Sequence, residues 1–440
     1  MLEGVVIENG TIITPGNELN NKDGKLTRVV IDENGKISHV GLEKPDEGYY
    51  DGYRKIDATG KIVAPGFMDS HVHITTDFEN IDSQELFDII QTKSLDFLKQ
   101  GVTSYMLGTM AMSDIKLEET LDVIRRLKGI DNGPELLGAL VEGTFINRDI
   151  AGAMDPKYIS PKSRFYFDGL INEYSDIIKK IVFAPEVNSE YFDFINRVNN
   201  TKGMVSSLGH SLATSTQAKN ILDNVRVLNH FFNRDSPLHH RDPGIVGAVL
   251  DYDFDRDLFL ELISDGVHVS PDAIKLLINI IENKGGNLED RIMLITDAIN
   301  IAAPMERDPD TFYDMKRIGG KKIYFIEGSP YLDSDGKILY GSTLTMIDAV
   351  KNMISWGYEP SIVIKSASST PAKAHYIDDK KGSIEKGKDA DIILIDRING
   401  KNKRTYRLGD VKYTLVKGKV KYISKDFQEV QNSGRKNETV

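Results

Sequence analysis

Two histidines at a spacing of two, His71 and His73, end the motif Asp69-Ser-His-Val-His. In an extended strand, residues two apart point to the same side, so both imidazoles can bind one metal ion. The pair alone is weak evidence, because histidines at this spacing also occur as ordinary buried polar groups. Its weight comes from the other acids and histidines of the chain.

Further candidates each end a short apolar run, as residues at the ends of strands would. They are Glu142, His210, His230, His268 and Asp297. Of the nine histidines, those on these segments are His71, His73, His210, His230, His239, His240 and His268. Scattered structural histidines would not concentrate in this way, so we interpret the set as one metal site. His39 and His375 lie outside it, and we interpret both as structural.

A divalent ion at such a site has a defined chemistry. It lowers the pKa of a bound water from about 15.7 toward about 7 and polarises an amide carbonyl. Asp297 could take the proton from the water and deliver it to the departing amine, as a positioned acid/base does. The alternative for Asp297 is an N-cap of a following helix. His268 could bind the carbonyl or an anionic group of the substrate, or be a satisfied histidine at a strand end.

Composition narrows the class of protein. The chain has 440 residues, a net charge of −11 and no cysteine, so His and carboxylate are the strong metal ligands that remain. The acidic charge, without a dense Lys/Arg block, argues against nucleic acid or membrane partners. Acids stand where a secretory signal has bases, and no apolar run approaches ~20 residues. We therefore expect a cytoplasmic protein.

The middle of the chain, about 65–374, alternates short apolar strands with amphipathic helices, which predicts a parallel sheet in an α/β protein. Expected helices include 83–100, 115–128 and 270–282. The expected strands are 62–69, 103–107, 136–141, 181–184, 204–208, 225–229, 266–269 and 292–296. Eight units favour a closed (β/α)8 TIM-like barrel, whose chemistry lies at the carboxyl ends of the strands. The candidates named above follow such strands.

Short β-rich runs separated by turn residues occupy both ends of the chain. Asn34-Gly35 between two such runs predicts a hairpin. The same pattern returns at 389–395, 411–416 and 418–423. Two distant β-rich ends most simply pair into one small domain, and the polar tail 426–440 is expected to be loose.

Motifs spread over the whole barrel carry a family resemblance. They are Ala64-Pro-Gly-Phe-Met-Asp-Ser-His-Val-His73, Val141-Glu-Gly143, Ala184-Pro-Glu186, Leu208-Gly-His-Ser211, Asn229-His-Phe-Phe-Asn233, Pro237-Leu-His-His-Arg-Asp-Pro-Gly244, Asp265-Gly-Val-His268, Thr296-Asp-Ala298 and Gly341-Ser-Thr-Leu-Thr-Met346. In this order they resemble the amidohydrolase superfamily, and within it the N-acetylglucosamine-6-phosphate deacetylases. The resemblance implies a small split β-sandwich, made by residues 1–64 and 375–425, beside a barrel at 65–374.

The resemblance also implies a ligand set. Glu142, His210 and His230 would hold the principal divalent ion, while His71 and His73, with Glu142 as a bridge, could hold a second. Some members of the family lack the His-x-His pair and use one metal. Zinc suits these N/O ligands, and iron or manganese is the alternative.

Arg241 is the natural anion anchor of the loop 236–244, because its planar fork fits phosphate or carboxylate. In the family the matching arginine commonly reaches the substrate phosphate of the neighbouring subunit, so the resemblance implies a homodimer. His239 and His240 could contact the substrate or could equally be ordinary loop residues.

The recognition residues depart from the family pattern. Leu140 and Thr144 replace a His and a Pro, and Met154 replaces a His that contacts the sugar. Arg234-Asp235 replaces a small Ala-Met turn whose backbone amides face the substrate. The substrate-binding candidates are Met154, Asn233, Arg234, Arg241 and His268.

We therefore expect a metal-dependent amide hydrolase, foremost one that removes acetyl from an N-acetylated amino sugar phosphate. The alternative is a hydrolase of another N-acyl sugar or an N-acyl amino acid. A non-enzymatic barrel relative is disfavoured, because the candidate metal ligands and Asp297 are all kept.

Overall fold

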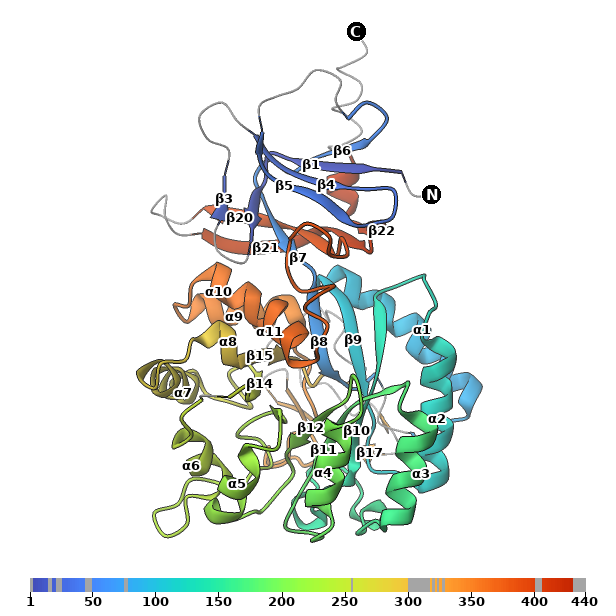
Figure 1. The fold of residues 1–440 in the computed structure, drawn as a ribbon, viewed down its shortest axis with the longest axis vertical. Helices are drawn as coiled ribbons and strands as arrows, with labels where there is room; N and C mark the ends of the chain where they lie inside the picture. Colours follow the sequence, from blue (N-terminus) through green and yellow to red (C-terminus); the bar gives the residue numbers. More distant parts are fainter. Residues whose placement is uncertain are drawn as a thin grey trace.

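The fold is a barrel joined to a smaller pair of sheets, as the computed structural model in Figure 1 shows. The structure describes residues 3–14, 18–20, 26–43, 50–74, 78–254, 256–299, 317–318, 321–322, 324–326, 329–399 and 406–429. No helix within these ranges is long and apolar enough to cross a membrane.

Eight parallel strands form the barrel in strict sequence order. They are β8 (Phe67–Val72), β9 (Val102–Gly108), β10 (Glu135–Phe145), β11 (Ile178–Phe183), β12 (Val205–Leu208), β13 (Val227–Leu228), β14 (Phe259–Ile263) and β15 (Ile292–Ile295). The first and last strands meet where Asp297 N donates to His71 O at 2.9 Å and His73 N donates to Ala298 O at 2.8 Å. The predicted eight-stranded barrel is confirmed.

Helices surround the barrel (Figure 1). They are α1 (Ser83–Lys99), α2 (Asp114–Leu127), α3 (Arg164–Tyr174), α4 (Tyr191–Asn199), α5 (Ser215–Leu222), α6 (Gly244–Leu250), α7 (Pro271–Asn283), α8 (Leu288–Arg291), α9 (Met346–Ser355), α10 (Pro360–Ser366) and α11 (Ser369–Ala374), with short 3-10 turns η1 (Arg148–Ile150) and η2 (Pro156–Tyr158). In α1 the side chain of Asp82 caps the first turn, and Leu86 and Ile90 face the core at helical spacing. The helices expected at 83–100, 115–128 and 270–282 are confirmed to within a residue or two.

Two of the expected strands need correction. The run 62–69 is divided between β7 (Lys61–Pro65), which belongs to the small domain, and β8. The expected strand 266–269 is wrong, and the seventh barrel strand is β14. Gly266 has φ 80°, and the Asp265 carboxylate accepts hydrogen bonds from Val267 N and His268 N, so this segment is a turn. The buried acid Glu261 interrupts the apolar run of β14 and hides it from a pattern search.

Two sheets pack face to face in the small domain. One has the order β5-β4-β1-β6 and the other β22-β21-β20-β7-β2-β3. The strands are β1 (Val5–Glu8), β2 (Thr11–Ile13), β3 (Glu18–Leu19), β4 (Leu26–Ile31), β5 (Ile37–Glu43), β6 (Arg54–Asp57), β7, β20 (Ile392–Asn399), β21 (Tyr406–Val416) and β22 (Lys419–Ile423). Antiparallel pairing of β7 with β20 joins the two ends of the chain, and residues of both sheets share one apolar core. The β-sandwich formed by both chain ends is confirmed, as is the β4–β5 hairpin, whose Gly35 has φ 76°.

Part of the expected loose tail is ordered. Residues 425–429 are helical, and Phe427 is buried with its ring 5.8 Å from that of Tyr413. The rest of the tail, 430–440, lies outside the described residues. Between β15 and α9 lie two small hairpins, β16 (Arg317–Ile318) with β17 (Lys321–Lys322) and β18 (Tyr324–Ile326) with β19 (Ser329–Tyr331).

Candidate metal centre

Six of the predicted side chains meet at one end of the barrel. They are His71, His73, Glu142, His210, His230 and Asp297. The first five are buried, and the Asp297 side chain is 13% exposed. Three of the six have left-handed backbone, with φ 48° at His210, 28° at His230 and 48° at Asp297. Such backbone is costly for residues other than glycine and clusters at functional sites.

One group of ligand atoms has the spacing of a single ion. Glu142 Oε1 lies 3.4 Å from His210 Nε2 and 3.2 Å from His230 Nε2, and the two nitrogens are 3.1 Å apart. A tetrahedral ion with bonds of about 2.1 Å holds its ligand atoms roughly 3.4 Å apart. Asn229 Nδ2 donates to the same Glu142 oxygen at 2.6 Å and helps to fix it.

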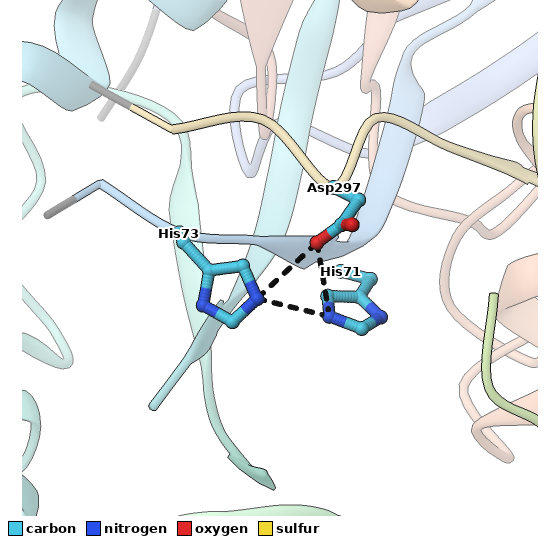
Figure 2. Close-up of side chains that lie close together, drawn as sticks. All are labelled: His71, His73 and Asp297. Carbon is cyan, nitrogen blue, oxygen red and sulfur yellow. Dashed lines mark hydrogen bonds and ion pairs between the residues drawn. The ribbon is translucent and has the colours of Figure 1, made fainter. Parts of the chain in front are cut away.

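A second group lies beside the first. Figure 2 shows His71, His73 and Asp297 pointing toward one another. His71 lies on β8, His73 directly follows that strand, and Asp297 lies in the loop after β15. The two Nε2 atoms are 3.1 Å apart, and Asp297 Oδ1 is 3.5 Å from that of His71 and 3.3 Å from that of His73. Glu142 Oε2 lies 3.7 Å and 3.3 Å from these same nitrogens. One oxygen of Glu142 thus faces each group.

The histidine hydrogen bonds show that this donor set suits a divalent ion. The Nδ1 atom of every one of the four rings faces an oxygen, namely Glu261 Oε2 at 3.0 Å for His71, Gly108 O at 3.1 Å for His73, Ile150 O at 3.1 Å for His210 and Asn233 O at 3.0 Å for His230. These oxygens only accept, so each Nδ1 carries a proton and each Nε2 faces inward, where it can bind a metal ion once any proton on it is lost. Bare nitrogens 3.1 Å apart repel one another unless a cation lies between them. The residues present therefore fit a metal ion.

The charges of the cluster lead to the same conclusion. Burial by itself lowers the pKa of His71, but the charges of Glu142 and Glu261 outweigh it and raise that pKa to about 10. Burial also opposes the protonated form of His73, yet hydrogen bonds to Asp297 and Glu142 raise its pKa to about 9. Burial alone would raise the pKa values of Glu142 and Asp297, whereas the neighbouring histidines hold both below their usual range. Anionic carboxylates thus demand positive charge here, which protons or a metal ion can supply.

The capping alternative for Asp297 finds no support in its surroundings. Its carboxylate faces His73, and no helix begins at Asp297 in the described stretch that ends at residue 299. The side chain is therefore placed to act on whatever occupies the neighbouring cavity.

That cavity, of about 370 Å³, receives most of the expected substrate residues. Met154, Asn233, Arg234 and His268 line it together with His73, Glu142, His210, His230 and Asp297. The side chain of Arg234 is half-buried and lies over Gly152, where an added Cβ would come within 2.9 Å of Arg234 Nε. His268 Nδ1 pairs with Asp265 Oδ2 at 2.6 Å.

Other expected recognition residues do not reach this cavity. Arg241, His239 and His240 are exposed and are absent from its lining. Leu140 is fully buried in the hydrophobic core, so its difference from the family pattern concerns packing. Sequence reasoning missed Lys337 and Tyr340 of the lining.

Sequence reasoning also missed two buried charged residues, Lys180 on β11 and Glu261 on β14. A charged residue inside a short apolar strand was the available signal, since such residues are seldom fully buried unless they are paired.

Comparison with known proteins finds amidohydrolases, among them deacetylases of amino sugar phosphates. The profile of the amidohydrolase family matches residues 210–423. The N-acetylglucosamine-6-phosphate deacetylase of Vibrio furnissii is 32% identical over 83% of this chain and 86% of its own length. The N-acetylgalactosamine-6-phosphate deacetylase of Escherichia coli O157:H7 is 30% identical over 76% of this chain and 84% of its own length. The crystal structure of N-acetylglucosamine-6-phosphate deacetylase from Pasteurella multocida matches with a TM-score of 0.75 at 29% identity, covering 96% of this chain and 100% of that one.

Proposed function

Because the chain belongs to the amidohydrolase family and is a homologue of the N-acetylglucosamine-6-phosphate deacetylases, we propose that it hydrolyses the acetamide of an N-acetylated amino sugar phosphate. The observation that carries the proposal is the convergence of four Nε2 atoms and two carboxylates beside a cavity of about 370 Å³. The products would be acetate and a free amine.

In this proposal Glu142, His210 and His230 hold the principal ion, with zinc as the expected metal. His71 and His73 would hold a second, with Asp297 Oδ1 and Glu142 Oε2 as the neighbouring carboxylate oxygens. When bound, such ions lower the pKa of a water molecule and polarise the amide carbonyl.

Asp297 is the proposed acid/base. Its pKa, held low by the histidines, keeps it anionic at neutral pH, as a base must be. A carboxylate has two oxygens, so one can face the histidines while the other moves a proton. Asp297 would take the proton of the attacking water and pass it to the amide nitrogen as the C–N bond breaks.

The anion of the substrate has two candidate anchors. Arg234 lines the cavity of its own chain, whereas Arg241 is exposed and would have to serve the cavity of a neighbouring subunit in a homodimer. Arginine binds phosphate through paired, charge-assisted hydrogen bonds. We propose that Arg234 binds the anion within its own chain. Arg241 would bind the anion only in a homodimer, where it would serve the cavity of the neighbouring subunit.

Acetate release from four compounds tests the proposal. They are N-acetylglucosamine and N-acetylgalactosamine, each with and without a 6-phosphate. We expect kcat/KM to be at least ~10-fold higher with the phosphate, the lower range for a lost hydrogen bond to a charged group. Equal or faster hydrolysis of the neutral sugars would contradict the sugar phosphate assignment.

Two matched variants then locate the anchor. Arg234→Met should raise KM for the phosphorylated sugar and leave the neutral sugar nearly unchanged. Arg241→Met should act in the same way only if the protein is a dimer in solution, which light scattering measures. An equal effect of Arg234→Met on both sugars would remove its role as an anion anchor.

A second candidate function is hydrolysis of a different N-acyl compound. It is favoured by Met154, which offers the cavity an apolar wall where the family has a histidine that contacts the sugar. A substrate hydroxyl left without a partner costs about 1 to 3 kcal/mol, so a compound with an apolar group there should be preferred over N-acetylglucosamine 6-phosphate. A panel of N-acyl sugars and N-acyl amino acids tests this candidate. It fails if that sugar phosphate has the highest kcat/KM and exceeds ~10⁵ M⁻¹s⁻¹.

A further inference from the structure

A pair of opposite charges lies buried beside the histidine cluster, and the proposed chemistry does not use it. Lys180 on β11 and Glu261 on β14 both have side chains with 0% exposure, and Lys180 Nζ donates to Glu261 Oε1. β12 and β13 separate these strands in the sheet order, so the pair spans the interior of the barrel.

Glu261 contacts a residue from each of the two ligand groups. Its Oε2 accepts from the ring Nδ1 of His71 at 3.0 Å and lies 3.3 Å from the backbone N of His230. Its Oε1 lies 3.4 Å from Ser70 Oγ as well as next to Lys180. One carboxylate therefore orients the ring of a ligand in the second group and the backbone of a ligand in the first.

Stability alone does not explain this pair. Taking two charges out of water is costly, and well-packed apolar residues of similar volume often stabilise a core as well or better. A carboxylate on the far nitrogen of a ligating histidine, by contrast, fixes the ring and makes its other nitrogen a stronger donor. Lys180 balances the charge that Glu261 brings into the barrel.

We propose that Glu261 and Lys180 form a positioning pair for the candidate metal centre. Glu261 holds His71 with Nε2 inward and restrains His230, and Lys180 keeps that carboxylate charged and in place. The ion at His71, His73 and Asp297 depends on the pair most, because only His71 has its ring bound by Glu261. The inference rests on the proposed function only in requiring that metal ions bind to these groups.

Two variants disturb the pair in different ways, one through its charge and one through its position. Glu261→Gln combined with Lys180→Met removes both charges at nearly constant shape. Glu261→Asp keeps a negative charge for Lys180 but is one methylene shorter, which withdraws it from His71. Purified wild type and variants would be stripped with a chelator and titrated with zinc against a chromophoric chelator, with the bound metal counted by mass spectrometry. Cobalt(II) spectra would report the ligand geometry.

We expect two ions in the wild type. In both variants the affinity for the second ion should fall about 10- to 100-fold, the usual effect of changing the group behind a ligating histidine. The double variant removes the charge of that group, and Glu261→Asp removes its contact with His71. The first ion should be bound nearly as in the wild type. The matched control is Lys381→Met with Asp391→Asn, which removes another buried ion pair. In that pair Lys381 Nζ lies 2.5 Å from Asp391 Oδ2, and Asp391 directly precedes β20. This control should lower the melting temperature and leave both affinities unchanged.

Wild-type affinity for both ions in the two variants would overturn the inference, and so would an equal loss in the control, because the effect would then be general destabilisation. If the double variant does not fold, Glu261→Asp decides by the same criterion. A wild-type protein that binds no divalent ion would instead refute the proposed function, which keeps the two failures distinct.

Discussion

The ligand end of the barrel and the interior of the β-sandwich are both largely buried, but they are built by opposite means. The sandwich core consists of apolar side chains such as Ile7, Val29 and Leu415, drawn from both sheets. The ligand end instead gathers histidines and carboxylates, and left-handed backbone carries His210 and His230. Local rules of propensity and polarity are kept in the first region and broken in the second, which is where function is expected.

The largest difference between the two regions should follow from removing a metal-binding side chain. His230→Ala should lose the principal ion and lower turnover by roughly 10⁴-fold or more, beyond the range for losing a general acid or base. Metal analysis and acetate release would measure both effects. The matched control is His39→Ala on β5 of the sandwich, which should keep metal and turnover. A His230→Ala protein with wild-type metal content and activity would show that the site is wrongly assigned.

Asp297→Asn sharpens the comparison within the ligand end itself. The amide keeps the shape of the side chain but cannot cycle a proton, so kcat should fall by at least ~100-fold. The first ion and the circular dichroism spectrum should remain. Near-normal turnover would leave Asp297 with a structural role.

Leu415→Ala should have the reverse profile. The side chain is fully buried in the sandwich core, so its loss should lower the free energy of unfolding by about 2 to 5 kcal/mol through lost burial and the cavity left behind. Denaturant unfolding measures this change. Turnover per folded molecule and bound metal should not change, and a loss of metal affinity would show that the two regions are coupled.

The smallest expected effect is a count of protons. Without metal the pKa values of His71 and His73 are raised to about 10 and about 9, so both rings are protonated at pH 8. Each must lose a proton to bind an ion, so zinc binding should release about two protons at pH 8 and tighten as the pH rises toward 10. Calorimetry in buffers of different ionisation enthalpy measures the release. Zinc binding without proton release would contradict this electrostatic description of the ligand end.

The sequence by itself determined much of this protein. Strand and helix periods, Asn34-Gly35 and the order of the strand-end residues predicted the barrel, the two β-rich ends and the six side chains that meet. These features are local or follow from one general rule, that parallel strands in a barrel place their carboxyl ends at one face.

Only the tertiary structure decided the rest. It placed Arg234 in the cavity and Arg241 outside it, Leu140 in the core, and the seventh strand at Phe259–Ile263. It also paired Lys180 with Glu261 across 81 positions of sequence. The physical reason is that a charge in an apolar strand is tolerated only when another strand supplies its partner. The spacing of residues along one strand does not show which residue of a distant strand it will face across a closed barrel.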